Sequence, residues 1–322
     1  MKKKLLAMLL SMAVLGSITG CSGGGSDEPD KLVVGSVIMN TSGEWFAEIM
    51  QGMEAAGEDL GVKVNIVSSD NEISKESDNV ATFVAQGADA ITICPISADA
   101  SSAAVESARA EGIPVVTWNT TVNSQVDSHV GVSNYDLGKL TGEYVAEYVA
   151  ENYPDGCKLA ILGNSSYEIG VERCNGFKDA IKNVAGLEIV AEQDAEMQDE
   201  GLDITEQILT ATPDVDIFWA WNQTSLLGCA THMQNIRNKD IVIMGTDMSV
   251  DLAKTMLGDS VTLQAITTQK PFDIGYNAVN NAVKLINGEE VEKVMSIELQ
   301  TYIKDDAEGL NAYIEDRKSL ME

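Results

Sequence analysis

The sequence predicts an α/β fold in which two lobes are each built around a doubly wound parallel sheet. From Lys31 onward, apolar segments of strand length alternate with segments of helical periodicity almost without interruption. The strand segments are continuously apolar, which is typical of parallel strands that are covered on both faces. A second round of the alternation begins at Asn134, and a chain of 322 residues is long enough for two domains. Two rounds therefore predict two lobes.

The first round of strands and helices begins at Leu32. In its first helix, apolar residues recur every three or four positions from Phe46 to Met53, and Gly61 ends the helix. Pro95 stops the third strand. We expect strands over 32–39, 62–67, 90–94, 114–118 and 129–132, a second helix that ends at Gly87, and a third helix over 99–110.

The second round opens with a long helix whose apolar face runs from Leu137 to Tyr148. Strands are expected over 158–162, 187–191, 217–221, 241–244 and 265–268, with helices over 170–182, near 203–210 and after Gln223. Trp219 and Trp221 point to the opposite face of their strand from Phe218. We therefore expect both tryptophans to pack in the interior rather than to stack on a ligand.

Four of the expected strands stop at a polar residue, and these residues are Asn119, Asn222, Asp247 and Gln269. Ligands of open parallel sheets bind outside the carboxyl ends of the strands. If the two sheets face each other, the four side chains would converge on one crevice, and we expect a binding site there. Asn222 and Asp247 could instead serve only as helix N-caps, because Asn and Asp favour that position.

The balance of charge and the absent motifs exclude several functions. The chain carries 50 acidic and 21 basic side chains, so neither nucleic acid nor an anionic membrane surface is expected as a partner. No Gly-x-Gly-x-x-Gly stands at the first turn from strand to helix, and no phosphate loop with Gly-Lys-Ser/Thr occurs. The chain has only two histidines, which argues against a catalytic triad and against a histidine-rich metal site. We expect no enzyme activity, no cofactor and no metal.

Apart from Cys21, the sequence contains Cys94, Cys157, Cys174 and Cys229. Their spacing fits no metal motif and no dense disulfide framework. An exported chain could pair two of them, for instance Cys157 with Cys174. Free buried thiols that behave as small apolar residues are at least as compatible with the pattern.

The first residues have the layout of an export signal. Three lysines precede an apolar run from Leu5 to Leu15, and Ile18-Thr19-Gly20-Cys21 follows. The cysteine at the cleavage site resembles the bacterial lipoprotein signal, which implies removal of residues 1–20 and lipidation of Cys21. A plain secretory leader with an incidental cysteine is the alternative. Residues 21–30 would then be a flexible tether, and we expect an extracytoplasmic protein of the cell envelope that its lipid anchors to the membrane.

From about Lys31 onward, the chain resembles the type I periplasmic binding proteins, in the branch that binds ribose and galactose. The motifs that carry the resemblance are Gly87 to Ile91, Gly112 to Val116, Val171 to Phe177, Ala220 to Gly228, Met244 to Asp247 and Thr268 to Gly275. The resemblance implies a three-segment hinge near 132–133, 269–270 and 297–300. It also implies a first lobe of residues 31–132 plus 270–297 and a second lobe of residues 133–269 plus 298–322.

The same resemblance implies a monomeric solute-binding protein of an ABC importer. Such a protein captures a monosaccharide or a related polyol between its lobes and presents it to the membrane subunits of the permease. The implied ligand contacts in the second lobe are Arg173, Asn222, Asp247 and Gln269. Those in the first lobe are Trp45, Phe46 and Asn119.

Three departures leave the ligand open. Ribose-binding proteins have Asp-Arg where this chain has Asn119-Thr120, and they have Asn where it has Cys94 and again where it has Gly43. Asn119 is similar to the galactose-binding pattern. Because Cys94 and Thr120 make the first lobe less polar, a nucleoside or another non-sugar ligand is the alternative, as is a sensory receptor that uses the same cleft.

Other roles are open for three residues near the expected site. Arg173 could be a surface cation on its helix. Phe46 fits the buried face of the first helix, so we expect it to be partly core and Trp45 to be the better ligand contact. The segment from Thr41 to Glu44 is typical of a capping box, and we expect Glu44 to cap the helix rather than to bind a hydroxyl.

Overall fold

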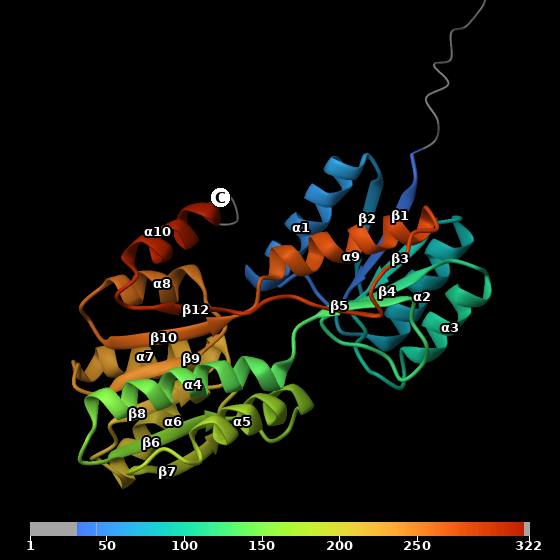
Figure 1. Cartoon of the computed structure of the whole chain (residues 1–322). Helices are drawn as coiled ribbons and strands as arrows, with labels where there is room; N and C mark the ends of the chain where they lie inside the picture. Colours follow the sequence, from blue (N-terminus) through green and yellow to red (C-terminus); the bar gives the residue numbers. More distant parts are fainter. Residues whose placement is uncertain (1–30, 43, 319–322) are drawn as a thin grey trace, which may run out of the picture. The chain divides into compact units, whose positions relative to one another are not determined.

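The computed structural model describes residues 31–42 and 44–318, which form two six-stranded sheets with helices on both faces (Figure 1). The expected signal peptide over 1–20, the lipidation of Cys21 and the tether over 21–30 lie outside the described residues. Within the described residues, none of the helices is both long and apolar enough to cross a bilayer.

The first sheet has the strand order β11-β5-β4-β3-β1-β2, and all of its pairs are parallel. Helices α1 (Glu44–Leu60) and α9 (Pro271–Ile286) bury their apolar residues against one face, and α2 (Ile73–Ala85) and α3 (Ser102–Ala110) cover the other. Its strands are β1 (Val33–Ile38), β2 (Lys63–Ser68), β3 (Ala90–Ile93), β4 (Val115–Trp118), β5 (Ser128–Gly131) and β11 (Val294–Ser296).

The second sheet has the order β12-β10-β9-β8-β6-β7. Helices α4 (Asn134–Asn152) and α5 (Glu168–Ile181) cover one face. The other face is covered by α6 (Gln198–Ala211), α7 (Gln223–Ile236), α8 (Val250–Leu257) and α10 (Ala307–Asp316). Its strands are β6 (Cys157–Gly163), β7 (Leu187–Asp194), β8 (Ile217–Ala220), β9 (Val242–Thr246), β10 (Thr262–Thr268) and β12 (Gln300–Ile303).

The doubly wound α/β class is confirmed, with one departure from parallel pairing. Strand β12 pairs antiparallel with β10, so it closes the second sheet with a strand of the opposite direction. The chain passes between the sheets after β5, after β10 and after β11, which places the connections at 132–133, 269–270 and 297–299. The exact lobe boundaries stay a prediction.

Side chains in the second sheet alternate between two separate apolar layers. Phe218 packs with α6 and α7 on one face, whereas Trp219 stacks on Phe177 of α5 on the other, with ring centroids 4.0 Å apart and planes 10° apart. Trp221 is also buried, and its indole N–H donates to the carbonyl of Ala195 at 2.8 Å. The prediction that both tryptophans pack in the interior is confirmed.

The four cysteines among the described residues are free and buried. The possible pair of Cys157 with Cys174 is therefore not formed. Each thiol instead fills space in an apolar cluster, as Cys157 and Cys174 do beside Phe177.

Candidate functional site

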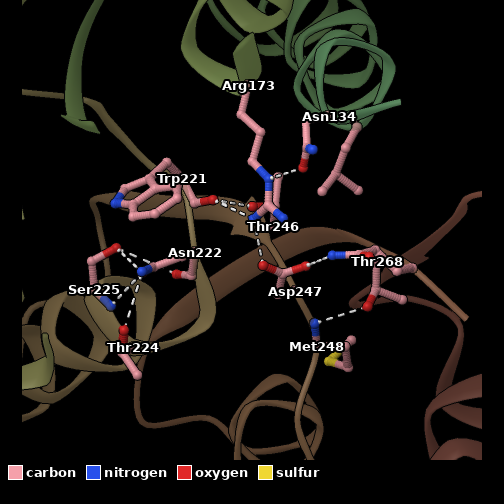
Figure 2. Close-up of polar contacts among 12 residues, drawn as sticks. Asn134, Arg173, Trp221, Asn222, Thr224, Ser225, Thr246, Asp247, Met248 and Thr268 are labelled. Atoms are coloured by element: carbon pink, nitrogen blue, oxygen red, sulfur yellow. Dashed lines mark hydrogen bonds and ion pairs between the residues drawn. The ribbon is translucent and has the colours of Figure 1, made fainter. Parts of the chain in front are cut away.

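Arg173 of α5 reaches the carboxyl ends of β8 and β9, and it is only 5% exposed. Its Nε donates to Oδ1 of Asn134 at 3.0 Å, and its Nη1 donates to the carbonyl of Trp221 at 3.1 Å and to Oδ2 of Asp247 at 2.5 Å. Figure 2 shows the guanidinium surrounded by these groups. The alternative of a surface cation is wrong, because a buried guanidinium with an ion-pair partner is held in one place.

Two glycines hold α5 close to α4 and so fix where Arg173 points. A Cβ at Gly138 would lie 1.9 Å from the carbonyl oxygen of Arg173, and one at Gly176 would lie 1.9 Å from that of Tyr135. Only glycine allows backbones to approach this closely without displacement. The spacing also places Asn134, the first residue of α4, within reach of the guanidinium.

Asp247 follows β9 directly and links two other predicted site residues. Its Oδ2 accepts from Arg173, and its Oδ1 accepts from Nε2 of Gln269 at 3.1 Å. Its backbone has φ of +63°, a left-handed conformation that Asp tolerates better than most residues. Because the N-cap of α8 is Ser249, the alternative that Asp247 caps that helix is wrong.

Gln269 follows β10 and completes the group. Its Nε2 is bound to Asp247, whereas its Oε1 is buried and has no hydrogen-bond partner among the described residues. An unsatisfied buried acceptor costs about 1–3 kcal/mol. Such an atom is a candidate acceptor for a donor that is not part of the chain. We call Asn134, Arg173, Asp247 and Gln269 the Arg173 cluster.

Asn222 lies just after the neighbouring strand β8, but its side chain bonds to a helix rather than to the Arg173 cluster. It is the N-cap of α7, and its Oδ1 accepts from the backbone N–H of Ser225 at 2.9 Å. The same oxygen accepts from the Ser225 and Thr224 hydroxyls (Figure 2). The Nδ2 atom donates to the carbonyl of Glu196 at 3.1 Å. Asn222 therefore caps α7, and at most one of its N–H groups is left for a ligand. Its role as a ligand contact stays a prediction.

Trp45 and Phe46 lie in the first turn of α1 and pack beside the end of β4. Their ring centroids are 4.9 Å apart in an edge-to-face arrangement, and Trp45 lies 6.3 Å from Trp118. Both residues are partly buried against the core of the first sheet, which fits the expectation for Phe46. The indole N–H groups of Trp45 and Trp118 are buried without a partner among the described residues.

Asn119 follows Trp118 at the end of β4, with φ of +59°. Its Nδ2 lies 3.8 Å from Sγ of Cys94, and the hydroxyl of Thr120 lies 3.6 Å from the same sulfur. Burial raises the pKa of the Cys94 thiol to about 11, so the group is a neutral, weak hydrogen-bonding partner at physiological pH. We call Trp45, Phe46, Trp118 and Asn119 the Trp45 cluster.

The structure thus sorts the predicted site residues into two groups. Arg173, Asp247 and Gln269 are joined by hydrogen bonds at one edge of the second sheet, and Asn222 lies at the same edge. The residues of the first lobe gather at the end of β4. No contact between the two clusters is found among the described residues, so their convergence on one crevice stays a prediction.

Sequence reasoning missed two members of these clusters. The sequence indicates Asn134 only as the start of the second round, although this residue stands at the beginning of a helix right after a connection between the sheets. The sequence indicates Trp118 only as the end of an apolar strand. Position at a strand end was the available signal for Trp118, whereas nothing in the sequence indicated the contact of Asn134 with Arg173.

Comparison with known proteins gives the family. Residues 34–290 match the periplasmic binding protein domain family. The ABC transporter periplasmic-binding protein YphF of Escherichia coli (strain K12) is 30% identical, over 85% of this chain and 86% of that protein. The ribose import binding protein RbsB of Bacillus subtilis (strain 168) is also 30% identical, over 92% of this chain and 98% of that protein.

Solved structures share the fold. A galactofuranose binding protein superposes with a TM-score of 0.76 at 22% identity, over 88% of this chain and 99% of that chain. A solute binding protein of Actinobacillus succinogenes 130z with bound D-allose gives 0.77 at 23% identity, over 87% and 100%. The chain therefore belongs to the type I periplasmic binding proteins, in the ribose and galactose branch, and it is a solute-binding protein rather than an enzyme.

Proposed function

We propose that the protein is a lipid-anchored solute-binding protein that captures a monosaccharide, or a related polyol, between its two lobes and delivers it to the permease of an ABC importer. The observation that carries the proposal is the buried Arg173 cluster, in which a cation, a carboxylate and an amide are already hydrogen-bonded to one another at the ends of neighbouring strands.

The charges of the cluster favour an uncharged ligand. Arg173 and Asp247 form an ion pair whose side chains are 6% and 16% exposed, so each already has its counter-charge. An ionic ligand would have to compete with that pair, whereas a hydroxyl can both donate to a carboxylate and accept from a guanidinium. Each hydrogen bond to a charged group contributes about 1.5–3 kcal/mol, so a few such bonds supply most of the specificity.

The cluster also has hydrogen-bonding capacity that the chain itself leaves unused. Nη2 of Arg173 has no partner among the described residues, and the Oε1 atom of Gln269 is an unsatisfied acceptor. On the first lobe, the indole N–H groups of Trp45 and Trp118 are unsatisfied donors. A polyhydroxylated ligand offers both donors and acceptors, and its apolar faces suit the aromatic rings of the Trp45 cluster.

Two further parts of the proposal rest on other grounds. Delivery to an ABC importer is supported by the names of the relatives, which include an ABC transporter periplasmic-binding protein and a ribose import binding protein. The lipid anchor is supported by the leader, whose lysines, apolar run and Gly20-Cys21 agree with a lipoprotein signal. Metabolic labelling with a fatty acid tests the anchor, because label should enter the native chain and not a Cys21→Ala variant.

Isothermal titration calorimetry against pentoses, hexoses, polyols and nucleosides tests the ligand class. We expect saturable heats with at least one sugar or polyol and none with nucleosides. The variant Asp247→Asn should weaken that binding by about 1.5–3 kcal/mol, which is about ten- to 150-fold. As a control, Asp127→Asn removes a carboxylate that pairs with Arg109 within the first lobe, and it should leave the affinity unchanged. No binding across the sugars and polyols would refute the proposed ligand class.

A further inference from the structure

Helix α1 of the first lobe carries two carboxylates, one turn apart, that contact elements of the second lobe. The Glu44 oxygens lie 3.3 and 3.4 Å from the backbone nitrogen of Val250, at the start of α8. The Glu48 carboxylate accepts from Nε and Nη2 of Arg317 at 2.7 and 2.8 Å, just after α10. The predicted capping box is wrong, because Glu44 is the first residue of α1 rather than its third.

These elements belong to different cores. The apolar residues of α1 pack on the first sheet, as Ile49 and Met53 do. The apolar residues of α8 and α10, which include Leu252 and Leu310, pack on the second sheet. The contacts of Glu44 and Glu48 therefore join two lobes that otherwise have separate interiors.

The ion pair of Glu48 with Arg317 is built as an interior contact. The two side chains are 5% and 16% exposed, and two parallel hydrogen bonds fix their relative orientation. The guanidinium carbon lies 3.6 Å from the ring centroid of Tyr313, and Nη1 donates to the carbonyl of the same residue at 3.3 Å. A surface pair of long side chains would lack this support and would contribute little.

Arg317 also lies beside the connections between the sheets. It lines a small cavity of about 180 Å³ together with Gln269 and Lys270, which follow β10, and with Gln300, which begins β12. The pair with Glu48 is therefore placed where a relative movement of the lobes would change its geometry.

We propose that Glu44, Glu48, Val250 and Arg317 form a clasp that holds the two lobes in the arrangement of this structure and sets the fraction of molecules that occupy it. The reason is the burial of Glu48. A buried ion pair adds little net stability compared with an apolar pair, but removal of one partner leaves an uncompensated charge. Without Arg317, a movement of α1 away from α10 would return the carboxylate of Glu48 to water. Burial already raises the pKa of the Glu48 carboxyl in spite of Arg317, which agrees with a tightly enclosed site.

Hydrogen–deuterium exchange of the full chain tests the clasp, with Arg317→Met as the variant. We expect exchange in the first turns of α1 and α8 to accelerate by about tenfold, because local opening there becomes more frequent, and exchange in β6, β8 and β9 to stay unchanged. Arg109→Met is the matched control. Arg109 also binds a carboxylate through two hydrogen bonds, to Asp127, but both residues lie in the first lobe. Its replacement should leave α8 unaffected.

A second variant distinguishes the loss of a clasp from a general destabilisation of the fold. The double replacement Glu48→Leu with Arg317→Met removes both charges and keeps apolar volume, so exchange in α1 and α8 should return toward that of the native chain. If Arg317→Met does not fold, Glu48→Gln replaces it and should give the same local acceleration. Equal exchange in the native chain and the variant would overturn the proposal, as would a uniform acceleration throughout both lobes.

Discussion

Replacement of Asp247 by Asn isolates the charge at the centre of the Arg173 cluster. Asn has nearly the same shape and keeps an oxygen that can accept from Nε2 of Gln269, so the hydrogen bond of 3.1 Å can persist. The guanidinium of Arg173 loses its counter-charge while it remains 5% exposed. Its bonds to Asn134 and to the carbonyl of Trp221 are neutral and compensate only in part.

The expected loss follows from the burial of the pair. Removal of one partner from a buried ion pair costs about 3–5 kcal/mol, and the 16% exposure of the Asp247 side chain points to the lower end, about 3 kcal/mol. With a urea m-value of about 3 kcal/mol/M, the unfolding midpoint should fall by about 1 M. Far-ultraviolet circular dichroism in a urea titration measures this midpoint.

A matched substitution and a double-mutant cycle make the test specific. Asp127→Asn breaks the pair with Arg109, whose side chains are 23% and 28% exposed, and it should cost only about 1 kcal/mol. Arg173→Met combined with Asp247→Asn should cost less than the sum of the single variants, with a coupling of about 2 kcal/mol. If Asp247→Asn shifts the midpoint no more than Asp127→Asn does, or if the coupling is close to zero, the reasoning from burial is wrong.

Three further predictions concern packing, protons and thiols. Gly138→Ala should destabilise the protein by about 1–3 kcal/mol in the same urea assay, because the new Cβ would clash with the carbonyl of Arg173. A loss of unfolding free energy below about 0.5 kcal/mol would contradict the close contact between the two helices. Burial lowers the pKa of His129, whose Nδ1 lies 3.0 Å from the Thr117 hydroxyl. The folded state therefore binds fewer protons than the unfolded state below the ordinary value of 6.5, and unfolding free energy should fall as the pH drops from 6.5 toward the lowered pKa. That fall should be smaller in His129→Gln, and an equal fall in both chains would exclude this histidine as its cause. In a Cys21→Ala chain, the four buried thiols should react with a disulfide reagent at pH 8 only after the chain unfolds. The reason is that burial raises the pKa of Cys94 to about 11 and that of Cys229 to about 12. Rapid reaction of the folded chain would contradict that burial.

The sequence predicted most of the elements up to position 249 and missed most of those that follow. Strands from β1 to β10 were expected close to their observed positions. Several of them, such as β3 and β8, are continuous runs of buried apolar residues, whereas β2 and β7 are only partly buried or exposed. Strand β11 has only three residues, none of them buried, so it gives no such signal. Strand β12 and the helices α8, α9 and α10 also follow position 249 and were not predicted, although α9 begins at Pro271 in the usual manner.

Position in a motif indicated the candidate site residues, but their partners in the structure could not be read from the chain. Arg173 could be placed on a helix, yet its burial depends on Asn134 and Asp247, which are 39 and 74 positions away. For Glu44, the local pattern itself led to a wrong prediction. A local pattern predicted a cap for its own helix, whereas the structure directs the carboxylate to Val250, 206 positions away. Contacts over such separations are set by topology and packing rather than by local propensity.

The two clusters lie in different lobes, and this limits how strongly a ligand can change the arrangement of the lobes. The Arg173 cluster is held together by its own hydrogen bonds, so a ligand bound there alone would interact equally in every arrangement of the lobes and would shift none of them. Under the proposed function, the shift comes from additional bonds to the first lobe, for which the N–H groups of Trp45 and Trp118 are available. Two neutral hydrogen bonds contribute about 1–3 kcal/mol, or about five- to 150-fold in population. The expected tenfold effect of Arg317→Met lies within that range, so we expect the proposed clasp and a ligand to shift the lobe equilibrium to a comparable extent.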